Sequence, residues 1–241
     1  MGKSKRVCEF NLRPGRMLTR KYEVTELLGQ GWEGEVYKIV ERSTGIERAA
    51  KMFYPHRNPG DKTAKLYARK LHRLRHCPVI IQYHTREEIY YKRTPITVLI
   101  SEYVEGEKLS DFITRQRGKR VTPFEAVHLL HSLASGIEQI HQLREYHGDL
   151  HTENIIVNHF GLGFEIKLID FYHWSSPKSE SIQTDITDMI RIFYDVLGGS
   201  RHYPNHNERI KKICCGLKTG LILKKFPTAS RLKDHLESMA W

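Results

Sequence analysis

Short runs of alternating apolar and polar residues fill the first part of the chain. Three such runs lie within residues 22–55, separated by turn residues such as Ser43, Thr44 and Gly45. Two more follow at 80–91 and 96–104. A period of two is typical of strands buried on one face, and glycine-containing turns between them indicate hairpins. The pattern predicts an antiparallel meander, with one helix over 61–75 whose apolar residues are scattered among basic ones.

From residue 122 onward the apolar positions recur at helical spacing. Thr122, Pro123 and Glu125 have the sequence of a capping box with proline at the first helical position. The apolar face that follows comprises Val127, Leu130, Ala134, Ile137 and His141. Further helices are expected over 186–197 and 230–239, with a short strand pair, 154–160 and 164–171, before them. Strands followed by helices, without a repeating βαβ unit, predict an α+β fold with a β-rich lobe and a mainly helical lobe.

Composition is consistent with a folded protein. Of the 241 residues, 39% are hydrophobic and 10% aromatic, which is enough for a core and excludes disordered and collagen-like chains. No apolar run is long enough to span a membrane, and the N-terminus lacks a signal-peptide pattern. We therefore expect a cytoplasmic protein with no membrane partner. The four cysteines are too irregularly spaced for a disulfide framework.

The net charge of +11 is concentrated in two segments. Residues 1–21 contain seven basic residues and one acidic residue, and residues 61–76 contain six and one. The rest of the chain is balanced. Such segments are either solvated surface or contacts for a polyanion or an acidic protein partner.

A glycine-rich string joins the first two predicted strands. Gly29, Gly31, Gly34 and Val36 form the pattern G-x-G-x-x-G-x-V. Glycines allow backbone N–H groups to approach phosphate closely, and the strand-to-strand setting argues against a dinucleotide-binding fold. Lys51 follows in an apolar strand, where a lysine behind a glycine loop can meet nucleotide phosphates.

The decisive motif is His147-Gly148-Asp149-Leu150-His151-Thr152-Glu153-Asn154, followed by Asp170-Phe171. This matches the H-x-D-L-x-x-x-N catalytic loop and the metal-binding Asp-Phe motif of protein kinases in order and separation. Residues 102–106 resemble the segment that joins the two kinase lobes, and 225–232 resemble a run near the end of the kinase domain. From residue 22 to 241 the chain therefore resembles a protein-kinase-like phosphotransferase.

The resemblance implies ATP and Mg²⁺ as cofactors and a role for each motif residue. Asp149 would be the catalytic base, with His151 in place of the catalytic-loop lysine. Asn154 and Asp170 would hold the metal. The nucleotide-binding set would comprise Gly29, Gly31, Gly34, Val36, Lys51, Glu102 and Val104. The implied organisation is a basic N-terminal extension (1–21), an N-lobe (22–101), a hinge (102–106) and a C-lobe (107–241).

Departures from the kinase pattern are also present. The helix over 61–76 should offer a glutamate to Lys51, yet its only acid is at its start. Either another carboxylate substitutes, with Asp61, Glu87 or Glu88 as candidates, or Lys51 pairs with Asp170 until nucleotide and metal bind. Gly148 replaces the usual arginine of the catalytic loop, and Tyr172 replaces a glycine.

The activation segment is very short as well. Only 14 residues separate Asp170 from Asp185, which aligns with the aspartate of the next long helix, and no A-P-E sequence is present. We therefore expect phosphorylation of protein Ser or Thr without activation-loop control. Two alternatives remain open from the sequence. The H-G-D-L-H sequence resembles that of aminoglycoside- and choline-type small-molecule kinases. The missing helix glutamate is compatible with a nucleotide-binding pseudokinase scaffold.

Overall fold

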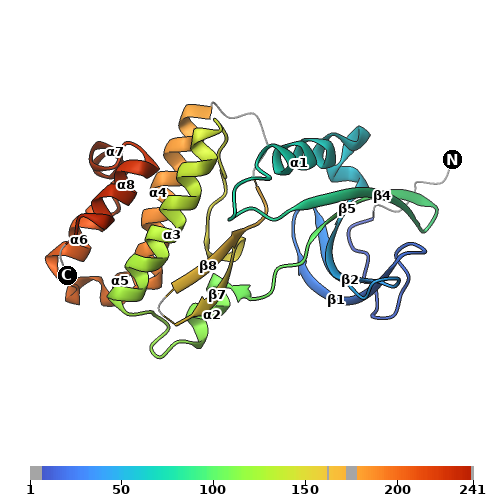
Figure 1. The fold of residues 1–241 in the computed structure, drawn as a ribbon, viewed down its shortest axis with the longest axis horizontal. Coiled ribbons are helices and arrows are strands. Elements are labelled where there is room, and N and C mark those ends of the chain that lie inside the picture. Colours follow the sequence, from blue (N-terminus) through green and yellow to red (C-terminus); the bar gives the residue numbers. More distant parts are fainter. Residues whose placement is uncertain (1–6, 162, 172–177, 240–241) are drawn as a thin grey trace. The chain divides into compact units, whose positions relative to one another are not determined.

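A computed structural model describes residues 7–161, 163–171 and 178–239. Figure 1 shows the order of strands and helices along the chain. The strands are β1 (Tyr22–Gln30), β2 (Gly34–Glu41), β3 (Glu47–Phe53), β4 (Tyr83–Tyr91), β5 (Thr94–Glu102), β6 (Glu107–Lys108), β7 (Ile155–Phe160) and β8 (Gly163–Leu168). The α-helices are α1 (Lys62–Arg73), α2 (Leu109–Arg115), α3 (Pro123–Gln142), α4 (Lys178–Val196), α5 (Gly199–His202), α6 (Glu208–Cys214), α7 (Thr219–Lys225) and α8 (Ala229–Glu237). Short 3₁₀ turns are η1 (Pro55–Arg57), η2 (Pro59–Asp61), η3 (Thr152–Asn154), η4 (Tyr203–Asn205) and η5 (Cys215–Leu217).

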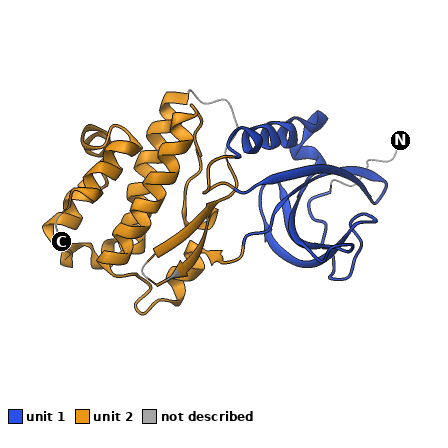
Figure 2. Ribbon diagram, viewed as in Figure 1, with its two compact units in different colours: residues 1–75, 81–104 blue, residues 76–80, 105–241 orange. Residues whose placement is uncertain are grey.

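The chain forms two compact units (Figure 2). The first unit contains residues 1–75 and 81–104, and the second contains residues 76–80 and 105–241. All five strands of the larger sheet lie in the first unit, whereas all α-helices except α1 lie in the second. The fold is therefore α+β with segregated lobes, as the hydrophobic pattern predicts.

The first unit is built on an antiparallel sheet with the strand order β1-β2-β3-β5-β4. One face of the sheet is buried because apolar side chains alternate along each strand. Tyr37 and Ile39 on β2 and Ala50 and Met52 on β3 are all fully buried. Val36 and Lys51, at alternate positions of these strands, are partly exposed, and they are the positions that matter for the site below.

Residues before β1 contribute to this core. Phe10, Leu12 and Leu18 are buried among the sheet residues. The backbone N–H of Phe10 donates to the carboxylate of Glu35 at 2.8 Å, and the Tyr91 hydroxyl donates to the Phe10 carbonyl at 2.9 Å. Part of the 1–21 segment, expected to be an extension, is thus integrated into the first unit, because alternate apolar side chains within it find partners in the sheet.

The second unit packs around α3. This helix contacts α8, α4 and β8, and its apolar face is buried from Ala126 to Ile140. The capping box at its start is formed as the sequence predicts: the Thr122 hydroxyl accepts from the Glu125 N–H, and the Glu125 carboxylate accepts from the Thr122 N–H. The small sheet β6-β7-β8 completes the unit.

Several helices differ from the sequence-based expectation. Helix α4 begins at Lys178, eight residues before the expected start, because its first two turns are polar and carry no apolar signal. Helix α2 and helices α5 to α7 were not predicted. Leu66 on α1 is 45% exposed, since Ala64 and Tyr67 occupy the buried face instead.

Within the described part of the chain, no helix combines the length and the apolar character that crossing a bilayer requires.

Candidate active site

The glycine loop is the turn between β1 and β2. Gly31 N–H donates to the Gly34 carbonyl at 2.9 Å, which closes the turn. A Cβ on Gly34 would lie 1.9 Å from the Met52 carbonyl oxygen, so glycine is required there by the approach of β3. A Cβ on Gly29 or Gly31 would meet no atom within 4 Å. These two glycines leave open space above their backbone, as the binding of phosphate requires.

Val36 and Lys51 face each other across the β2–β3 ladder. Both are partly exposed, whereas their neighbours Tyr37, Ala50 and Met52 are fully buried on the other face. The strict alternation of strand side chains therefore sends Val36 and Lys51 to the same face of the sheet. The structure places these two residues opposite each other on the strands that follow the glycine loop.

A carboxylate of the glycine loop, that of Glu33, pairs with Lys51. Glu33 Oε2 lies 3.0 Å from Lys51 Nζ. Two of the carboxylates considered from sequence have other partners: Asp61 accepts from Arg86 and Thr97, and Glu88 lies 3.6 Å from Arg86. The sequence does not indicate Glu33. Strand alternation continued from β2 would place its side chain on the same face of the sheet as the buried Glu35, opposite to the face of Lys51, whereas the turn directs it toward Lys51.

The remaining residues of the nucleotide-binding set lie at the end of β5. The Glu102 carboxylate accepts from the Gln82 N–H at 2.8 Å, and the Glu102 N–H donates to the Gln82 carbonyl at 2.8 Å. The side chain of Glu102 is thus used to fix the end of the strand. Val104 is partly exposed and is the last residue of the first unit.

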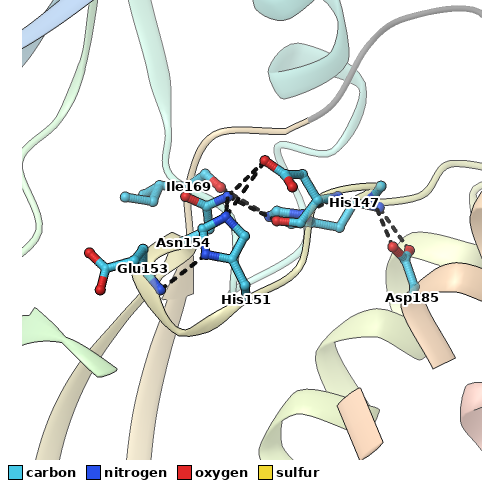
Figure 3. A network of polar contacts seen from close by, with 8 residues as sticks. His147, His151, Glu153, Asn154, Ile169 and Asp185 are labelled. Carbon is cyan, nitrogen blue, oxygen red and sulfur yellow. Dashed lines mark hydrogen bonds and ion pairs between the residues drawn. The ribbon is translucent and has the colours of Figure 1, made fainter. Parts of the chain in front are cut away.

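The catalytic-loop residues form one hydrogen-bonded cluster in the second unit (Figure 3). The Asn154 amide nitrogen lies 2.8 Å from the Asp149 carbonyl oxygen and 3.3 Å from its Oδ2. The Asp149 side chain is 57% exposed. His151 Nε2 lies 2.9 Å from Asn154 Nδ2 and 3.7 Å from Asp149 Oδ2. Asp149, His151 and Asn154 therefore meet, with the Asp149 carboxylate open to a reactant.

Asp170 is joined to the same loop through its neighbours. The Ile169 N–H donates to the Asn154 carbonyl at 3.0 Å, and His147 Nε2 lies 3.0 Å from the Ile169 carbonyl oxygen. The ring of Phe171 lies against that of His147, with centroids 4.5 Å apart. Asp170 itself has a φ of +55°, a left-handed conformation that aspartate tolerates better than most residues. Tyr172, the next residue of the motif, lies outside the described residues.

Asp185 on α4 holds the start of the catalytic loop through hydrogen bonds. Its carboxylate is fully buried and accepts from the N–H groups of His147 and Gly148 at 2.8 and 2.7 Å. His141 Nε2 lies 2.9 Å from the same carboxylate. A buried carboxylate is stable when hydrogen bonds satisfy it, and these bonds hold the loop that carries Asp149.

The donor set suits Mg²⁺ with nucleotide. Because the Asn154 amide nitrogen is used within the loop, the amide oxygen is the atom available to a cation. Asp170, which follows the residue hydrogen bonded to the Asn154 carbonyl, adds a carboxylate to the donor set. Magnesium is usually bound by one or two protein oxygens together with substrate phosphates and water. A site made by the protein alone is not expected, and no cluster of three His, Cys, Asp or Glu side chains suited to a metal occurs among the described residues.

The comparison with family models decides the family. Residues 22–208 match the model described as protein kinase domain. The chain belongs to the protein kinase domain family. The match includes the glycine loop, Lys51, the catalytic loop and Asp170, whereas the resembling run at 225–232 lies beyond it.

A solved kinase domain shows the same fold. The crystal structure of the Mycobacterium tuberculosis PknI kinase domain, as a C20A_R136A double mutant, superposes with a TM-score of 0.68 at 18% sequence identity. The match covers 95% of this chain and 98% of that chain. With 95% of the chain covered, the fold is that of a kinase domain.

Proposed function

We propose that this kinase domain transfers the γ-phosphate of ATP, with Mg²⁺, to a Ser or Thr hydroxyl of a protein. The observation that carries the proposal is the Asp149–Asn154 cluster, to which the backbone before Asp170 is hydrogen bonded. A general base and two metal-binding oxygens have little structural reason to be held together in this way, and phosphoryl transfer needs all three.

In this mechanism ATP supplies the phosphoryl group and Mg²⁺ neutralises charge on the phosphate oxygens. The oxygen of the acceptor hydroxyl bonds to the γ-phosphorus while the bond from this phosphorus to the β-phosphate oxygen breaks. Asp149 accepts the proton that the hydroxyl loses. Asn154 and Asp170 hold the metal ion. His151 Nδ1 lies 3.3 Å from the Glu153 N–H, and its Nε2 lies 2.9 Å from the Asn154 amide nitrogen, so the ring is held beside Asp149. We assign the exposed edge of this ring to the γ-phosphate oxygens.

The first unit binds the rest of the nucleotide in this proposal. Lys51 meets the α- and β-phosphates, and the backbone N–H groups of the loop from Gly29 to Gly34 cover them. Val36 supplies an apolar contact on the same face of the sheet. The backbone around Glu102 and Val104 provides hydrogen bonds for the adenine base.

A protein acceptor fits the chain better than a small molecule. Between Val104 and Asp149, a stretch that the structure describes completely, the chain forms β6, α2 and α3. No additional helix is inserted there to enclose a small substrate. The six residues between Phe171 and Lys178 leave little room for a regulatory activation loop, so we infer that the enzyme acts without one.

We also propose an acidic protein partner for helix α1. Its sequence contains no acid, and Lys62, Lys65, Arg69 and Arg73 are exposed at helical spacing along one face. Leu66 is a large apolar side chain that is exposed on the same helix. Single-stranded nucleic acids are bound with stacking aromatic side chains as well as charge, and the aromatic residue of α1, Tyr67, is buried. An acidic protein segment therefore suits this face better.

The function is tested by replacing the proposed base. Asp149→Asn should reduce transfer of radiolabelled γ-phosphate to a generic protein acceptor by about 10²- to 10⁴-fold, because general-base catalysis contributes that much. ATP binding, measured with a fluorescent nucleotide analogue, should remain. Asp111→Asn, at an exposed position of α2, is the matched control and should leave both quantities unchanged.

Mass spectrometry of the labelled acceptor then decides the substrate class. Phosphate on Ser or Thr that disappears in Asp149→Asn supports the proposal. Transfer to small alcohols instead of protein would replace it with the small-molecule alternative. Magnesium-dependent nucleotide binding without transfer to any acceptor would identify a pseudokinase.

A further inference from the structure

We propose that Glu33 is a positioning residue for Lys51, taking from within the glycine loop the role that the kinase family gives to a helix glutamate. The inference deepens the proposed function and rests on it for the identity of the nucleotide. Its evidence lies entirely within the first unit: an ion pair, an aromatic side chain in place of a helix carboxylate, and a loop anchored on both sides of Glu33.

The ion pair is close and largely shielded from solvent. Glu33 Oε2 and Lys51 Nζ are 3.0 Å apart, and the two side chains are 18% and 13% exposed. Charge-assisted hydrogen bonds in such surroundings are stronger than those of exposed pairs, because water screens them less. The pair can therefore fix the direction of the long and flexible lysine side chain.

Helix α1 presents an aromatic ring to Lys51. Tyr67 is 3% exposed, and the centroid of its ring lies 4.5 Å from Lys51 Nζ. The Phe53 ring lies 5.5 Å from the same nitrogen. These cation–π contacts attract the ammonium group but do not accept a hydrogen bond from it in a fixed direction as a carboxylate does. The helix thus holds Lys51 from one side, and the directed interaction comes from the loop.

Two other carboxylates of the first unit, Asp61 and Glu35, have other partners. Asp61 Oδ1 accepts from Thr97 and Asn58, and its Oδ2 accepts from Arg86. Glu35 is buried and accepts from the Phe10 N–H and from the hydroxyls of two tyrosines. These two groups stabilise the sheet and its connections, whereas the Glu33 carboxylate lies against Lys51 at 3.0 Å.

The loop that carries Glu33 is anchored on both sides. The Tyr54 N–H donates to the Glu33 carbonyl at 2.9 Å, and the Gln30 amide donates to the Tyr54 hydroxyl at 3.0 Å. The guanidinium carbon of Arg57 lies 3.5 Å from the centroid of the Trp32 ring. These contacts place the Glu33 carboxylate before any ligand binds, which is the preorganisation that a positioning residue needs.

The proposal is tested first without nucleotide. Glu33→Gln should increase the rate at which a small amine-reactive reagent labels Lys51, because the amino group loses the carboxylate that covers it. Mass spectrometry measures the labelling of Lys51 over time. Glu26→Gln, the same change at an exposed position of β1, is the matched control and should label as the wild type does. Glu33→Asp, which keeps the charge, should give a labelling rate between those of the wild type and Glu33→Gln.

The second measurement is nucleotide affinity and turnover. Glu33→Gln should weaken ATP binding and lower kcat/KM by about ten- to a hundredfold, the effect expected for losing one charge-assisted hydrogen bond. Moving the carboxylate to α1, with Tyr67→Glu in the Glu33→Gln background, should restore much of this loss. Thermal unfolding of each variant verifies that the first unit is folded.

The outcomes are distinct. Tighter ATP binding in Glu33→Gln would overturn the proposal and identify Glu33 as a group that competes with phosphate for Lys51. Unchanged Lys51 labelling in a folded Glu33→Gln variant would also overturn it. If the wild type binds ATP but transfers no phosphate, the proposed function fails, whereas labelling and ATP affinity still test the role of Glu33.

Discussion

Asp188 lies one turn beyond Asp185 in α4, and its environment opposes its charge. Its side chain is 15% exposed and Arg191 Nη1 lies 3.0 Å from the carboxylate. Burial raises the pKa of Asp188 to about 6, with the nearby Asp185 and Asp149 adding to the rise and Arg191 opposing it. The folded state therefore keeps this proton to a higher pH than the unfolded state does.

This shift predicts a loss of stability with rising pH. Between about pH 4 and pH 6 the folded chain holds a proton on Asp188 that the unfolded chain has lost, so the free energy of unfolding falls as pH rises. Asp188→Asn should be more stable than the wild type by about 2 kcal/mol at neutral pH, less than the full shift implies because the pair with Arg191 is lost. Urea unfolding at a series of pH values measures the difference.

The comparison between variants carries the test, since other groups also titrate. The stability difference should be small near pH 4 and grow through pH 6. Asp111→Asn, at an exposed position, should show no such growth. A difference for Asp188→Asn that stays constant with pH would show that Asp188 is charged in the folded protein throughout this range.

At the scale of single residues, the sequence identifies those site residues that lie in one contiguous motif. Asp149, His151 and Asn154 are brought together by five residues of chain and their own hydrogen bonds, so their spacing is sufficient evidence. Glu33 was missed because its direction depends on the backbone of a turn, where the alternation of strand side chains ends. A partner found through tertiary geometry leaves no spacing signal in the sequence.

At the scale of elements, the β1–β2 hairpin depends on a close approach at one glycine. Gly34→Ala would place a methyl group 1.9 Å from the Met52 carbonyl oxygen, and because the obstacle is backbone, β2 and β3 must separate. We expect a loss of about 2 kcal/mol or more in unfolding free energy, with loss of ATP binding. Thermal unfolding without nucleotide and a titration with ATP measure the two effects.

Gly31→Ala is the matched control for the fold. Its Cβ meets no protein atom within 4 Å, so stability should stay within about 0.5 kcal/mol of the wild type. ATP affinity should nevertheless fall, because the methyl group occupies space over the backbone that the phosphates approach. Unchanged ATP affinity in Gly31→Ala would contradict the assignment of this loop to the phosphates.

Element length explains which helices the sequence predicted. α3 has 20 residues, a capping box and several turns of apolar periodicity, and its start was predicted to the residue. α2, α6 and α7 have seven residues each and α5 has four. Two turns or fewer give no measurable period, and such helices are stabilised by packing against the rest of the unit rather than by their own sequence.

At the scale of the molecule, the sequence predicts the class of fold but not the assignment of every segment. Residues 76–80 follow α1 in the chain yet belong to the second unit. There the Val79 carbonyl accepts from the Leu168 N–H at 2.7 Å, and the Val79 side chain fills the space that Gly136 leaves on α3. This pairing joins residues far apart in sequence, so local periodicity could not show it.

The excess of positive charge is a property of the molecule that can be tested on helix α1. Replacing Lys62, Lys65 and Arg69 together by Gln removes three exposed charges from one face. Binding of an oligoglutamate peptide, measured by fluorescence anisotropy, should weaken by about tenfold, because each exposed ion pair contributes a fraction of 1 kcal/mol. Wild-type binding should also weaken as salt rises, because exposed charges are screened.

A control with the same loss of charge separates a local surface from net charge. Lys212, Lys218 and Lys224 are exposed in the second unit, and their replacement by Gln changes the net charge equally. If α1 is the binding face, this variant keeps the affinity of the wild type for the peptide. Equal weakening in both variants would mean that the peptide responds to overall charge alone. Tighter binding of a single-stranded oligonucleotide than of the peptide, lost in the α1 variant, would replace the acidic protein by nucleic acid as the partner.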